Sequence, residues 1–530
     1  MRLNKTILIV VSLFFTFNTF AQLDLPTYKF GRVLSLIDAY YVDTVNTDKL
    51  VEDAIIGMLK ELDPHSVYIS KEEVKRMNEP LQGSFDGVGI QFNILDDTLM
   101  VVNPIPGGPS EKLGIRAGDR IVEVDGKNIA GIGLKNSDVI KMLRGEKGTK
   151  VNVKIIRRGV KNILDFTITR DKIPIYSLDA AYMVNNEIGY IKLNRFAATS
   201  MDEFYKAFNK LKEKNVKKLI LDLRGNGGGY LNTAVNLADQ FLPEGNMIVY
   251  TKGIHAPRYE EHATSKGVWE NGELVVLVDE GSASASEIVS GAIQDWDRGV
   301  IIGRRTFGKG LVQRPYVLPD NSMIRLTVAR YYTPSGRCIQ KSYAKGVKDY
   351  SKDIINRYNH GELTNADSIH FPDSLQYKTL KLKRTVYGGG GIMPDIFVPL
   401  DTTKVNELYA KLVRKGIIYQ YTISYMDTHR DELKTKYKSF DSYIKNFKIN
   451  DDILSGLYKK AEKEKIEIKD KDKKESRKDI SRLMKALIAR DLWDMSEYFQ
   501  IVNPDDKTYQ KAIEILSSKK AYEKALKKRK

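Results

Sequence analysis

The chain has 530 residues, 42% of them apolar, which is enough to build two to four domains with sizeable cores. Its 85 lysine and arginine residues outweigh 68 aspartate and glutamate residues, for a net charge of +17. The basic residues are dispersed among acidic ones and accompany no recognisable nucleic-acid motif, so the charge indicates a solvated surface and argues against nucleic-acid binding. With one cysteine, Cys338, the fold has no internal disulfide.

The first 21 residues have the pattern of a secretory signal peptide. Arg2 and Lys5 supply positive charge, and residues 7–17 form an apolar run that is too short for a comfortable membrane span. Thr19-Phe20-Ala21 is an acceptable cleavage site, so we expect a periplasmic mature chain that begins at Gln22. The alternative is an uncleaved anchor. No other long apolar segment follows, so we expect no stable membrane insertion after cleavage.

Residues 22–82 are predicted to be mostly helical. Apolar side chains recur about every four residues between Thr47 and Leu62, which is typical of an amphipathic helix. The phrase Leu62-Asp63-Pro64-His65-Ser66 then breaks the helical pattern. A capping or packing role suits His65 better than a catalytic one, because it lies directly after a proline.

Residues 83–172 are predicted to form a β-rich domain whose ordered segments resemble a PDZ domain. Gly87, Val88, Gly89 and Ile90 stand where the carboxylate-binding loop of such a domain lies. Glycines at these positions let successive backbone N–H groups converge on an anion. The resemblance implies that the loop binds the C-terminus of a substrate. The alternative is a packing module without a ligand.

Residues 173–400 alternate between strand and helix patterns. Strand-like apolar runs lie at 188–193, 219–223, 274–278 and 300–303, with helical patterns between them. This alternation predicts an α/β core, a sheet with helices on both faces. The polar stretch 341–385 is expected to be an excursion on the surface.

A corner of small residues follows the predicted strand at 274–278. Ser284 lies in this corner, directly before a helical pattern of apolar residues. Free backbone N–H groups and the dipole at a helix N-terminus favour developing negative charge, which suits a serine nucleophile. The alternative is that Ser284 only caps its helix, because Ser284-Ala285-Ser286-Glu287 fits a capping box.

A nucleophilic serine needs a base. The chain has six histidines, and none stands in a recognisable triad setting. Lys309 follows Ser284 by 25 positions, between Gly308 and Gly310 and close to apolar side chains that could desolvate its amine. Burial lowers the pKa of a lysine from about 10.4 toward the roughly 7–8 that a general base requires. Gln313 could hydrogen-bond the pair. The alternative is a lysine in a solvated turn.

This arrangement resembles the carboxyl-terminal processing peptidases, or tail-specific proteases, which are PDZ-containing Ser–Lys serine peptidases of family S41. A small-residue serine segment, a lysine in Phe-Gly-Lys-Gly 25 residues later and a glutamine four further on all match. The similarity covers roughly Tyr40–Pro399. It implies that Ser284 is the nucleophile, Lys309 the general base and Gln313 a supporting group. It also implies protein or peptide substrates with a free C-terminus, and neither a metal nor an organic cofactor.

A glycine-rich turn follows the predicted strand at 219–223 and lacks the Lys-Ser/Thr of a phosphate-binding P-loop. The peptidase family has a similar turn that supplies an oxyanion-hole N–H. The resemblance maps this role to Gly228, with Gly229 as the close second, and gives the other donor as the N–H of Ala285. Gly227 stands where many relatives have proline, which leaves the donor open among residues 227–229.

Residues 401–530 are predicted to be a charged helical region, to which the sequence assigns no function. Taken together, the sequence predicts a multidomain serine endopeptidase that cleaves exported proteins near their C-termini. A homo-oligomer is left open. The first alternative is an inactive PDZ adaptor or chaperone, against which Ser284 and Lys309 both argue. The second is a trypsin-like PDZ protease, but no His/Asp partner segment precedes the serine.

Overall fold

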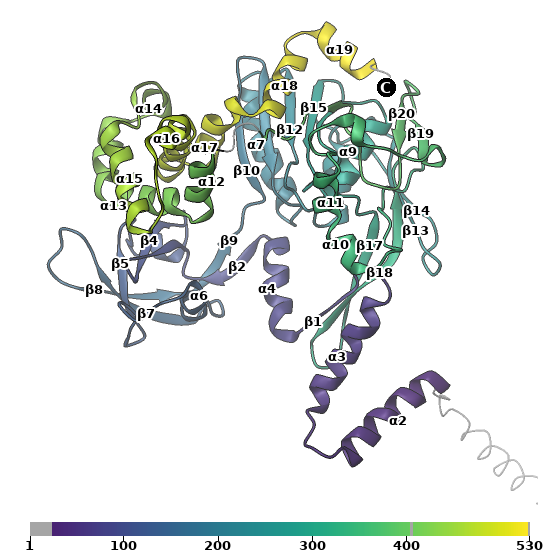
Figure 1. Ribbon diagram of the computed structural model, residues 1–530, viewed down its shortest axis with the longest axis horizontal. Helices are drawn as coiled ribbons and strands as arrows, with labels where there is room; N and C mark the ends of the chain where they lie inside the picture. The colour runs from purple at the N-terminus through teal and green to yellow at the C-terminus, as the bar shows by residue number, and fades with distance from the viewer. Residues whose placement is uncertain (1–23, 403–405, 528–530) are drawn as a thin grey trace, which may run out of the picture. The chain divides into compact units, whose positions relative to one another are not determined.

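The computed structural model describes residues 24–402 and 406–527, so the predicted signal peptide lies outside the described residues. The chain divides into two compact units, residues 1–68 and 69–530. In the first unit, α2 (Leu25–Tyr40) is followed by α3 (Thr47–Lys60), which confirms the predicted amphipathic helix (Figure 1). The Asp63 carboxylate then accepts the backbone N–H groups of His65 and Ser66, at 2.8 and 2.9 Å, and closes a turn at the predicted helix break.

The second unit begins with α4 (Lys71–Gln82) and the predicted β-rich domain. A short antiparallel pair joins β2 (Ser84–Gly87) to β9 (Asp171–Pro174). A six-stranded antiparallel sheet has the order β3 (Ile90–Leu95), β4 (Thr98–Pro104), β5 (Arg120–Val124), β7 (Lys150–Ile156) and β8 (Leu164–Thr169), with β6 (Lys127–Asn128) on β5. The helices α5 (Pro109–Lys112) and α6 (Asn136–Leu143) complete the domain. Its core is a separate cluster of buried aliphatic side chains, which confirms a β-rich module.

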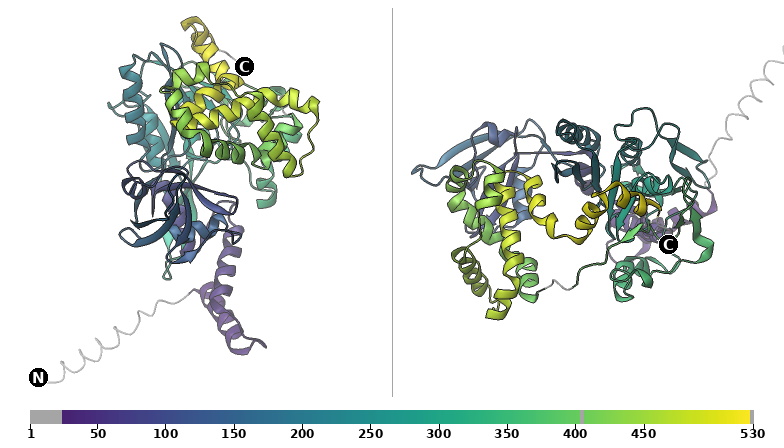
Figure 2. Two further views of the ribbon diagram at one scale, coloured as in Figure 1. Left: turned by 90° about the vertical axis from the view of Figure 1, so that its left-hand side faces the viewer. Right: turned by 90° about the horizontal axis from the view of Figure 1, so that it is seen from above.

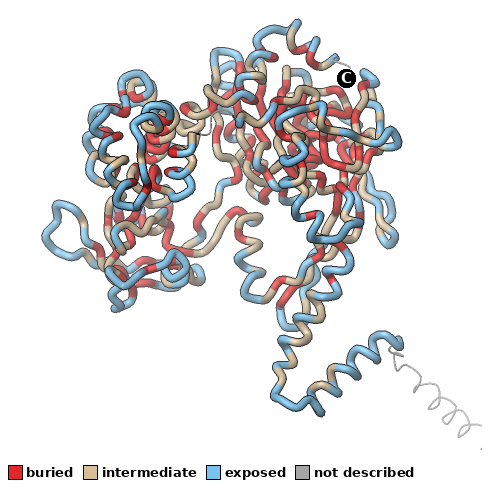
Figure 3. Tube along the Cα trace, in the orientation of Figure 1, coloured by how far each residue is buried: buried red, intermediate tan, exposed pale blue. Residues whose placement is uncertain are grey.

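Two hydrophobic cores, one on each face, flank a second six-stranded sheet. Its order is β10 (Leu178–Met183), β11 (Ile188–Leu193), β12 (Lys218–Asp222), β15 (Glu273–Val278), β16 (Val300–Gly303) and β21 (Ile396–Phe397). Only β10 runs antiparallel to its neighbour. The central strands are continuous apolar runs because parallel strands are buried on both faces, and Figure 3 shows this burial.

Helices cover both faces of this sheet, as predicted, but they come from different parts of the chain. On one face lie α7 (Ser200–Glu213), α8 (Leu231–Asp239) and α9 (Ala285–Asp295). On the other face lie α18 (Lys507–Leu516) and α19 (Lys519–Lys527), near the C-terminus (Figure 1). The predicted boundary at residue 400 stays a prediction, yet residues 507–527 share a core with the sheet.

A smaller sheet lies beside the first and carries part of the candidate site. It contains β13 (Met247–Lys252), β14 (Tyr259–His262), β17 (Leu311–Val317) and β18 (Met323–Tyr332). A further short strand, β1 (Val67–Ile69), follows the turn at Asp63. The long antiparallel hairpin of β17 and β18 has a register shift between Val312 and Gln313.

Most of residues 341–385 are exposed or partly exposed, as expected of a surface excursion, but the segment has secondary structure and a few buried side chains. The segment folds into α10 (Val347–Ser351), α11 (Asp353–Asn359), two 3₁₀ turns, η1 (Ala366–Ser368) and η2 (Asp373–Leu375), and β19 (Gln376–Lys378), which pairs with β20 (Thr385–Tyr387). The side chain of Arg357 is only 2% exposed and donates to the backbone carbonyls of Arg305 and Thr306, at 2.7 and 3.1 Å. Arg357 can be buried because it satisfies backbone carbonyls of the loop before Lys309.

The rest of the C-terminal region is a helical bundle with its own core, as predicted (Figure 2). It contains α12 (Glu407–Arg414), α13 (Ile417–Lys436), α14 (Phe440–Asn446), α15 (Asp451–Lys463), α16 (Asp470–Leu492), α17 (Met495–Val502) and the turn η3 (Asn503–Asp505). Asp427 on α13 pairs with Arg120 of the β-rich domain at 2.8 Å. Among the described helices, none has the length and apolar character needed to cross a membrane.

Candidate active site

Ser284 stands at the corner between β15 and α9, as the sequence predicts. Its φ is +55°, a left-handed conformation that is uncommon for a residue other than glycine. Its backbone N–H donates to Oε2 of Glu287 at 2.8 Å. The N–H of Ala285, at the first position of α9, has no acceptor within the described part of the chain. This N–H is therefore available to a negatively charged ligand at the helix N-terminus.

Lys309 lies in the loop that leads into β17, and its side chain is partly exposed. Its Nζ donates to Oε1 of Gln313 at 3.0 Å, so the predicted pairing of the lysine with this glutamine is present. Gly308, with a φ of +88°, gives the loop a conformation that a side chain would strain. An added Cβ there would also lie 3.2 Å from the Cβ of Lys341.

Glu287 joins the two halves of the site through its buried carboxylate. Its Oε2 accepts the backbone N–H groups of Ser284, at 2.8 Å, and Lys309, at 2.9 Å. Its Oε1 accepts the N–H of Gly308 at 2.7 Å and the hydroxyl of Thr306 at 2.6 Å. Burial raises the pKa of Glu287 to about 7, although all four donors favour the ionised form. The sequence analysis treated Glu287 only as part of a capping box, and that spacing was the signal that could have revealed it.

Tyr331 forms a second bridge and was missed by the sequence analysis. Its hydroxyl lies 2.6 Å from the carbonyl oxygen of Lys309 and 3.1 Å from that of Ser284. The side chain is 1% exposed, and burial raises the pKa of this phenol well above its ordinary value. The hydroxyl therefore stays protonated and acts as a donor to the backbones of both residues.

The glycine-rich turn lies against the serine corner. A Cβ added to Gly228 would lie 2.9 Å from the Cβ of Ser284 and 3.1 Å from the N of Ala285, so only glycine allows this approach. The N–H of Gly228 donates to Oδ1 of Asn226 at 2.9 Å, whereas the N–H of Gly229 has no acceptor among the described residues. The choice of oxyanion donor between these glycines stays a prediction.

The four predicted tail-binding residues are adjacent at the edge of the β-rich domain. Gly87 ends β2, Ile90 begins β3, and Gly89 has a φ of +74°. The N–H groups of Val88 and Gly89 have no acceptors within the described residues. The Val88 side chain is 3% exposed and belongs to the domain core, whereas Ile90 is partly exposed.

The site contains nucleophile and base candidates without an obvious metal centre. Within the residues that the structure describes, no group of three or more His, Cys, Asp or Glu side chains could hold a metal ion.

Four family models match successive parts of the chain. A model described as peptidase family S41 matches residues 187–350, and a PDZ-domain model matches residues 100–157. A model of the activating protease CtpB N-terminal domain matches residues 18–73. Residues 408–494, within the helical bundle, match a family of unknown function.

Individual proteins are similar over most of the chain. A carboxy-terminal-processing protease of Bartonella bacilliformis is 39% identical over 410 residues, which cover 76% of this chain and 90% of that protein. The carboxy-terminal processing protease CtpA of Bacillus subtilis is 36% identical over 343 residues, or 64% and 72% of the two chains. The solved structure of a photosystem II D1 C-terminal processing protease is 32% identical, covers 59% of this chain and 90% of that one, and has a TM-score of 0.35.

Proposed function

Because this chain belongs to peptidase family S41 and is a carboxy-terminal processing serine protease, we propose that Ser284 and Lys309 are its catalytic dyad. The Oγ of Ser284 attacks the carbonyl carbon of the scissile peptide bond while the neutral amine of Lys309 accepts the hydroxyl proton. The negative charge develops on the former carbonyl oxygen, which the N–H of Ala285 and a glycine N–H of residues 227–229 stabilise.

The second half of the reaction uses the same groups. The C–N bond of the intermediate breaks as the Lys309 ammonium returns its proton to the leaving amine. Water then attacks the ester carbon of the acyl-enzyme, and Lys309 takes a proton from that water and returns one to the Oγ of Ser284. The products are a shortened protein and its C-terminal peptide.

The bridge made by Glu287 is the observation that carries this proposal. A single carboxylate oxygen accepts the N–H groups of both Ser284 and Lys309, so the two backbone nitrogens lie within two hydrogen-bond lengths of each other. The Glu287 side chain is fully buried, so a movement of its carboxylate would disturb the hydrogen bonds to both residues. Ser284 and Lys309, which are 25 positions apart in sequence, are thereby held close together in one site.

The proposal extends to the substrate. Exported proteins would present a free C-terminal carboxylate to the PDZ domain, where the N–H groups of Val88 and Gly89 are open to an anion. The signal-peptide pattern in residues 1–21 supports a periplasmic location. Mass spectrometry of periplasmic C-terminal peptides, from cells with the wild-type enzyme and with Ser284→Ala, tests both points. Substrates confined to the cytoplasm would contradict the location.

A matched pair of serine variants tests the dyad. Ser284→Ala should lose peptide hydrolysis by about 10⁴-fold or more, because the nucleophile is gone. Ser290→Ala is the control, because Ser290 lies on the same helix and its hydroxyl donates to the carbonyl of Ser286, at 2.8 Å, away from the proposed dyad. Turnover of a free-acid peptide is followed by mass spectrometry. Near wild-type turnover by folded Ser284→Ala would overturn the assignment.

A further inference from the structure

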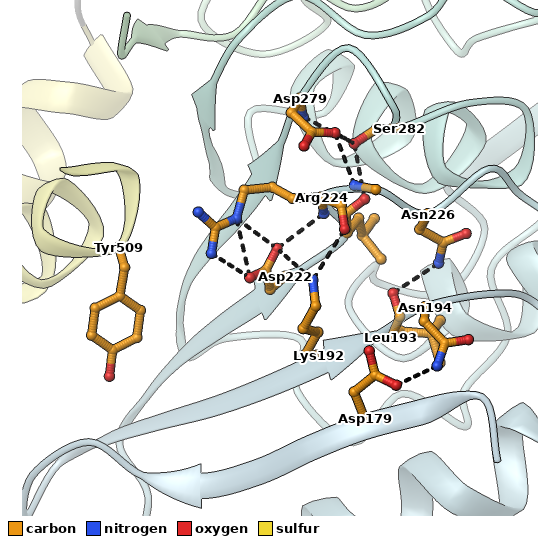
Figure 4. Close-up of polar contacts among 12 residues, drawn as sticks. Asp179, Lys192, Leu193, Asn194, Asp222, Arg224, Asn226, Asp279, Ser282 and Tyr509 are labelled. Carbon is orange, nitrogen blue, oxygen red and sulfur yellow. Dashed lines mark hydrogen bonds and ion pairs between the residues drawn. The ribbon is translucent and has the colours of Figure 1, made fainter. Parts of the chain in front are cut away.

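A buried ion pair stands at the start of the oxyanion turn. Asp222 ends β12, is fully buried and accepts a hydrogen bond from Nη2 of Arg224 at 2.6 Å (Figure 4). It also accepts one from the hydroxyl of Tyr190 at 2.7 Å. Burial alone would raise the pKa of Asp222, but the charges of Arg224 and Lys192 outweigh it and hold this pKa below its usual range. The pair is therefore ionised, and Arg224 stands four positions before Gly228.

The second anion at Arg224 comes from the C-terminal region. Nη1 of Arg224 donates to Oδ1 of Asp506 at 2.7 Å. The same oxygen accepts the N–H of Tyr509 at 2.7 Å, which makes Asp506 the N-cap of α18. Asp506 is thus held by its own helix, and that helix packs on the sheet through buried side chains such as Leu516. The guanidinium lies between two anchored carboxylates.

Asp506 adds a negative charge beside two cations that contact Asp222. Nζ of Lys192 lies 3.7 Å from Oδ1 of Asp222 and donates to the carbonyl of Arg224 at 3.0 Å. Lys192 and Arg224 therefore share the buried Asp222, and Asp506 gives Arg224 a second anionic partner. Phe499 of α17 lies with its ring 5.5 Å from the Lys192 ammonium, a further contact from the C-terminal region.

Asn226, two residues after Arg224, connects the oxyanion turn to the corner that holds Ser284. The Asn226 side chain donates to the carbonyl of Leu193 at 2.9 Å, as Figure 4 shows, and accepts the N–H of Gly228. The backbone carbonyl of Asn226 accepts hydrogen bonds from the N–H of Ala283 at 3.0 Å and from the hydroxyl of Ser286 at 2.8 Å. The turn and the nucleophile's corner are one hydrogen-bonded unit, so a shift at Arg224 displaces the oxyanion donors.

We propose that Asp506 is a positioning residue for the peptidase reaction, by which the C-terminal region fixes Arg224 and, through it, the oxyanion turn at residues 225–229. This inference rests on the proposed function, in which that turn supplies a backbone N–H to the oxyanion. It gives the C-terminal region a role in catalysis without any contact to the substrate.

Substitutions that keep the helix cap separate the ion pair from the capping role. Asn and Ser both cap helices, so Asp506→Asn and Asp506→Ser remove the charge while α18 keeps its N-cap. We expect kcat to fall about 10- to 100-fold with KM nearly unchanged, because a small displacement of an oxyanion donor acts on the transition state. Asp506→Glu keeps the negative charge and should retain most of the wild-type kcat. The control is Glu514→Gln, which removes a charge from the same helix, where Glu514 pairs only with Lys511 in the described structure.

A peptide aldehyde adds a readout that general destabilisation would not move. It forms a hemiacetal with Ser284 whose oxygen occupies the oxyanion position, so its inhibition constant should weaken in parallel with kcat. Binding of a tail peptide to the PDZ domain should stay the same in every variant, and so should the melting temperature, to within a few degrees.

Each outcome has one meaning. Folded Asp506→Asn with kcat within twofold of wild type, or an equal loss in Glu514→Gln, would overturn the inference and leave the dyad intact. Unfolding of both uncharged variants would assign Asp506 to stability and also overturn it. Activity in Ser284→Ala, measured alongside, would contradict the proposed function itself.

Discussion

The peptidase sheet has one face covered by α7, α8 and α9 and an opposite face covered by α18 and α19. The first three helices lie between the strands in sequence, and α9 begins directly after the nucleophile candidate. The last two helices come after a separate helical bundle, and the N-cap of α18 contacts Arg224. The helices of the first face come from the segments between the strands and include the nucleophile candidate's helix. The helices of the second face come from a distant segment and contact the residue that we propose positions the oxyanion turn.

Substitution of Lys309 tests whether the general base belongs to the site beside α9. Lys309→Arg should lower kcat/KM by on the order of 10³-fold or more, because a guanidinium keeps its proton at working pH and cannot accept one from serine. Lys206→Arg, an exposed change on α7, is the control and should have no effect. Peptide turnover measures both. Substantial activity in Lys309→Arg would mean that another group removes the proton.

The two faces should matter equally for stability. Leu516 on α18 is 0% exposed and Leu211 on α7 is 2% exposed, so each change to alanine should lower the free energy of unfolding by about 2–5 kcal/mol. Urea denaturation measures the loss, with the exposed Lys520→Ala expected to stay within about 0.5 kcal/mol of wild type. A negligible effect of Leu516→Ala would show that the packing of α18 on the sheet contributes little to stability.

Glu287 gives the first face a pH dependence close to neutrality. Its pKa is raised from 4.5 to about 7, so the folded state holds this proton more tightly than the unfolded state does. Its contribution to stability is full below about pH 4.5 and falls by about 3 kcal/mol as the pH rises to about 7. Glu287→Gln should remove this slope, as shown by urea denaturation of both proteins between about pH 5 and 8. Parallel pH profiles for wild type and variant would contradict the assignment.

The smallest expected effect lies outside both faces, in the PDZ domain. Amidation of a substrate's C-terminus removes a charge and an acceptor, which costs about 1.5–3 kcal/mol, or roughly ten- to a hundredfold in kcat/KM. Competition between matched free-acid and amide peptides measures the ratio. Deletion of residues 83–172 should abolish the discrimination. Equal cleavage by the wild-type enzyme would mean that the N–H groups of Val88 and Gly89 do not read the chain end.

The difference between the faces also explains what could be predicted from the sequence. Ser284, Lys309 and Gln313 stand at short, recognisable spacings, and the strands around them are plain apolar runs. Glu287 was visible only as a helix cap, because nothing local shows that both of its oxygens reach the loop of Lys309. Tyr331 left no signal, since its contact with Ser284 spans 47 positions.

The remaining failures share one physical cause. Arg357 belongs to a polar stretch that was expected on the surface, yet it is buried because it donates to backbone carbonyls. Asp506 reads as an ordinary helix cap, and its partner Arg224 lies 282 positions away. Long-range pairs between polar groups create no periodicity, so a pattern of apolar residues cannot reveal them.

The backbone of Ser284 sets stability against activity at a single position. A φ of +55° costs a residue with a Cβ about 1–3 kcal/mol and costs glycine almost nothing. Selection for a sturdier protein alone would therefore replace this serine with glycine. A lineage that no longer needed to cut peptides would drift in that direction. Glycine at this corner in a relative would therefore indicate a protein that has lost peptidase activity and only binds its ligands.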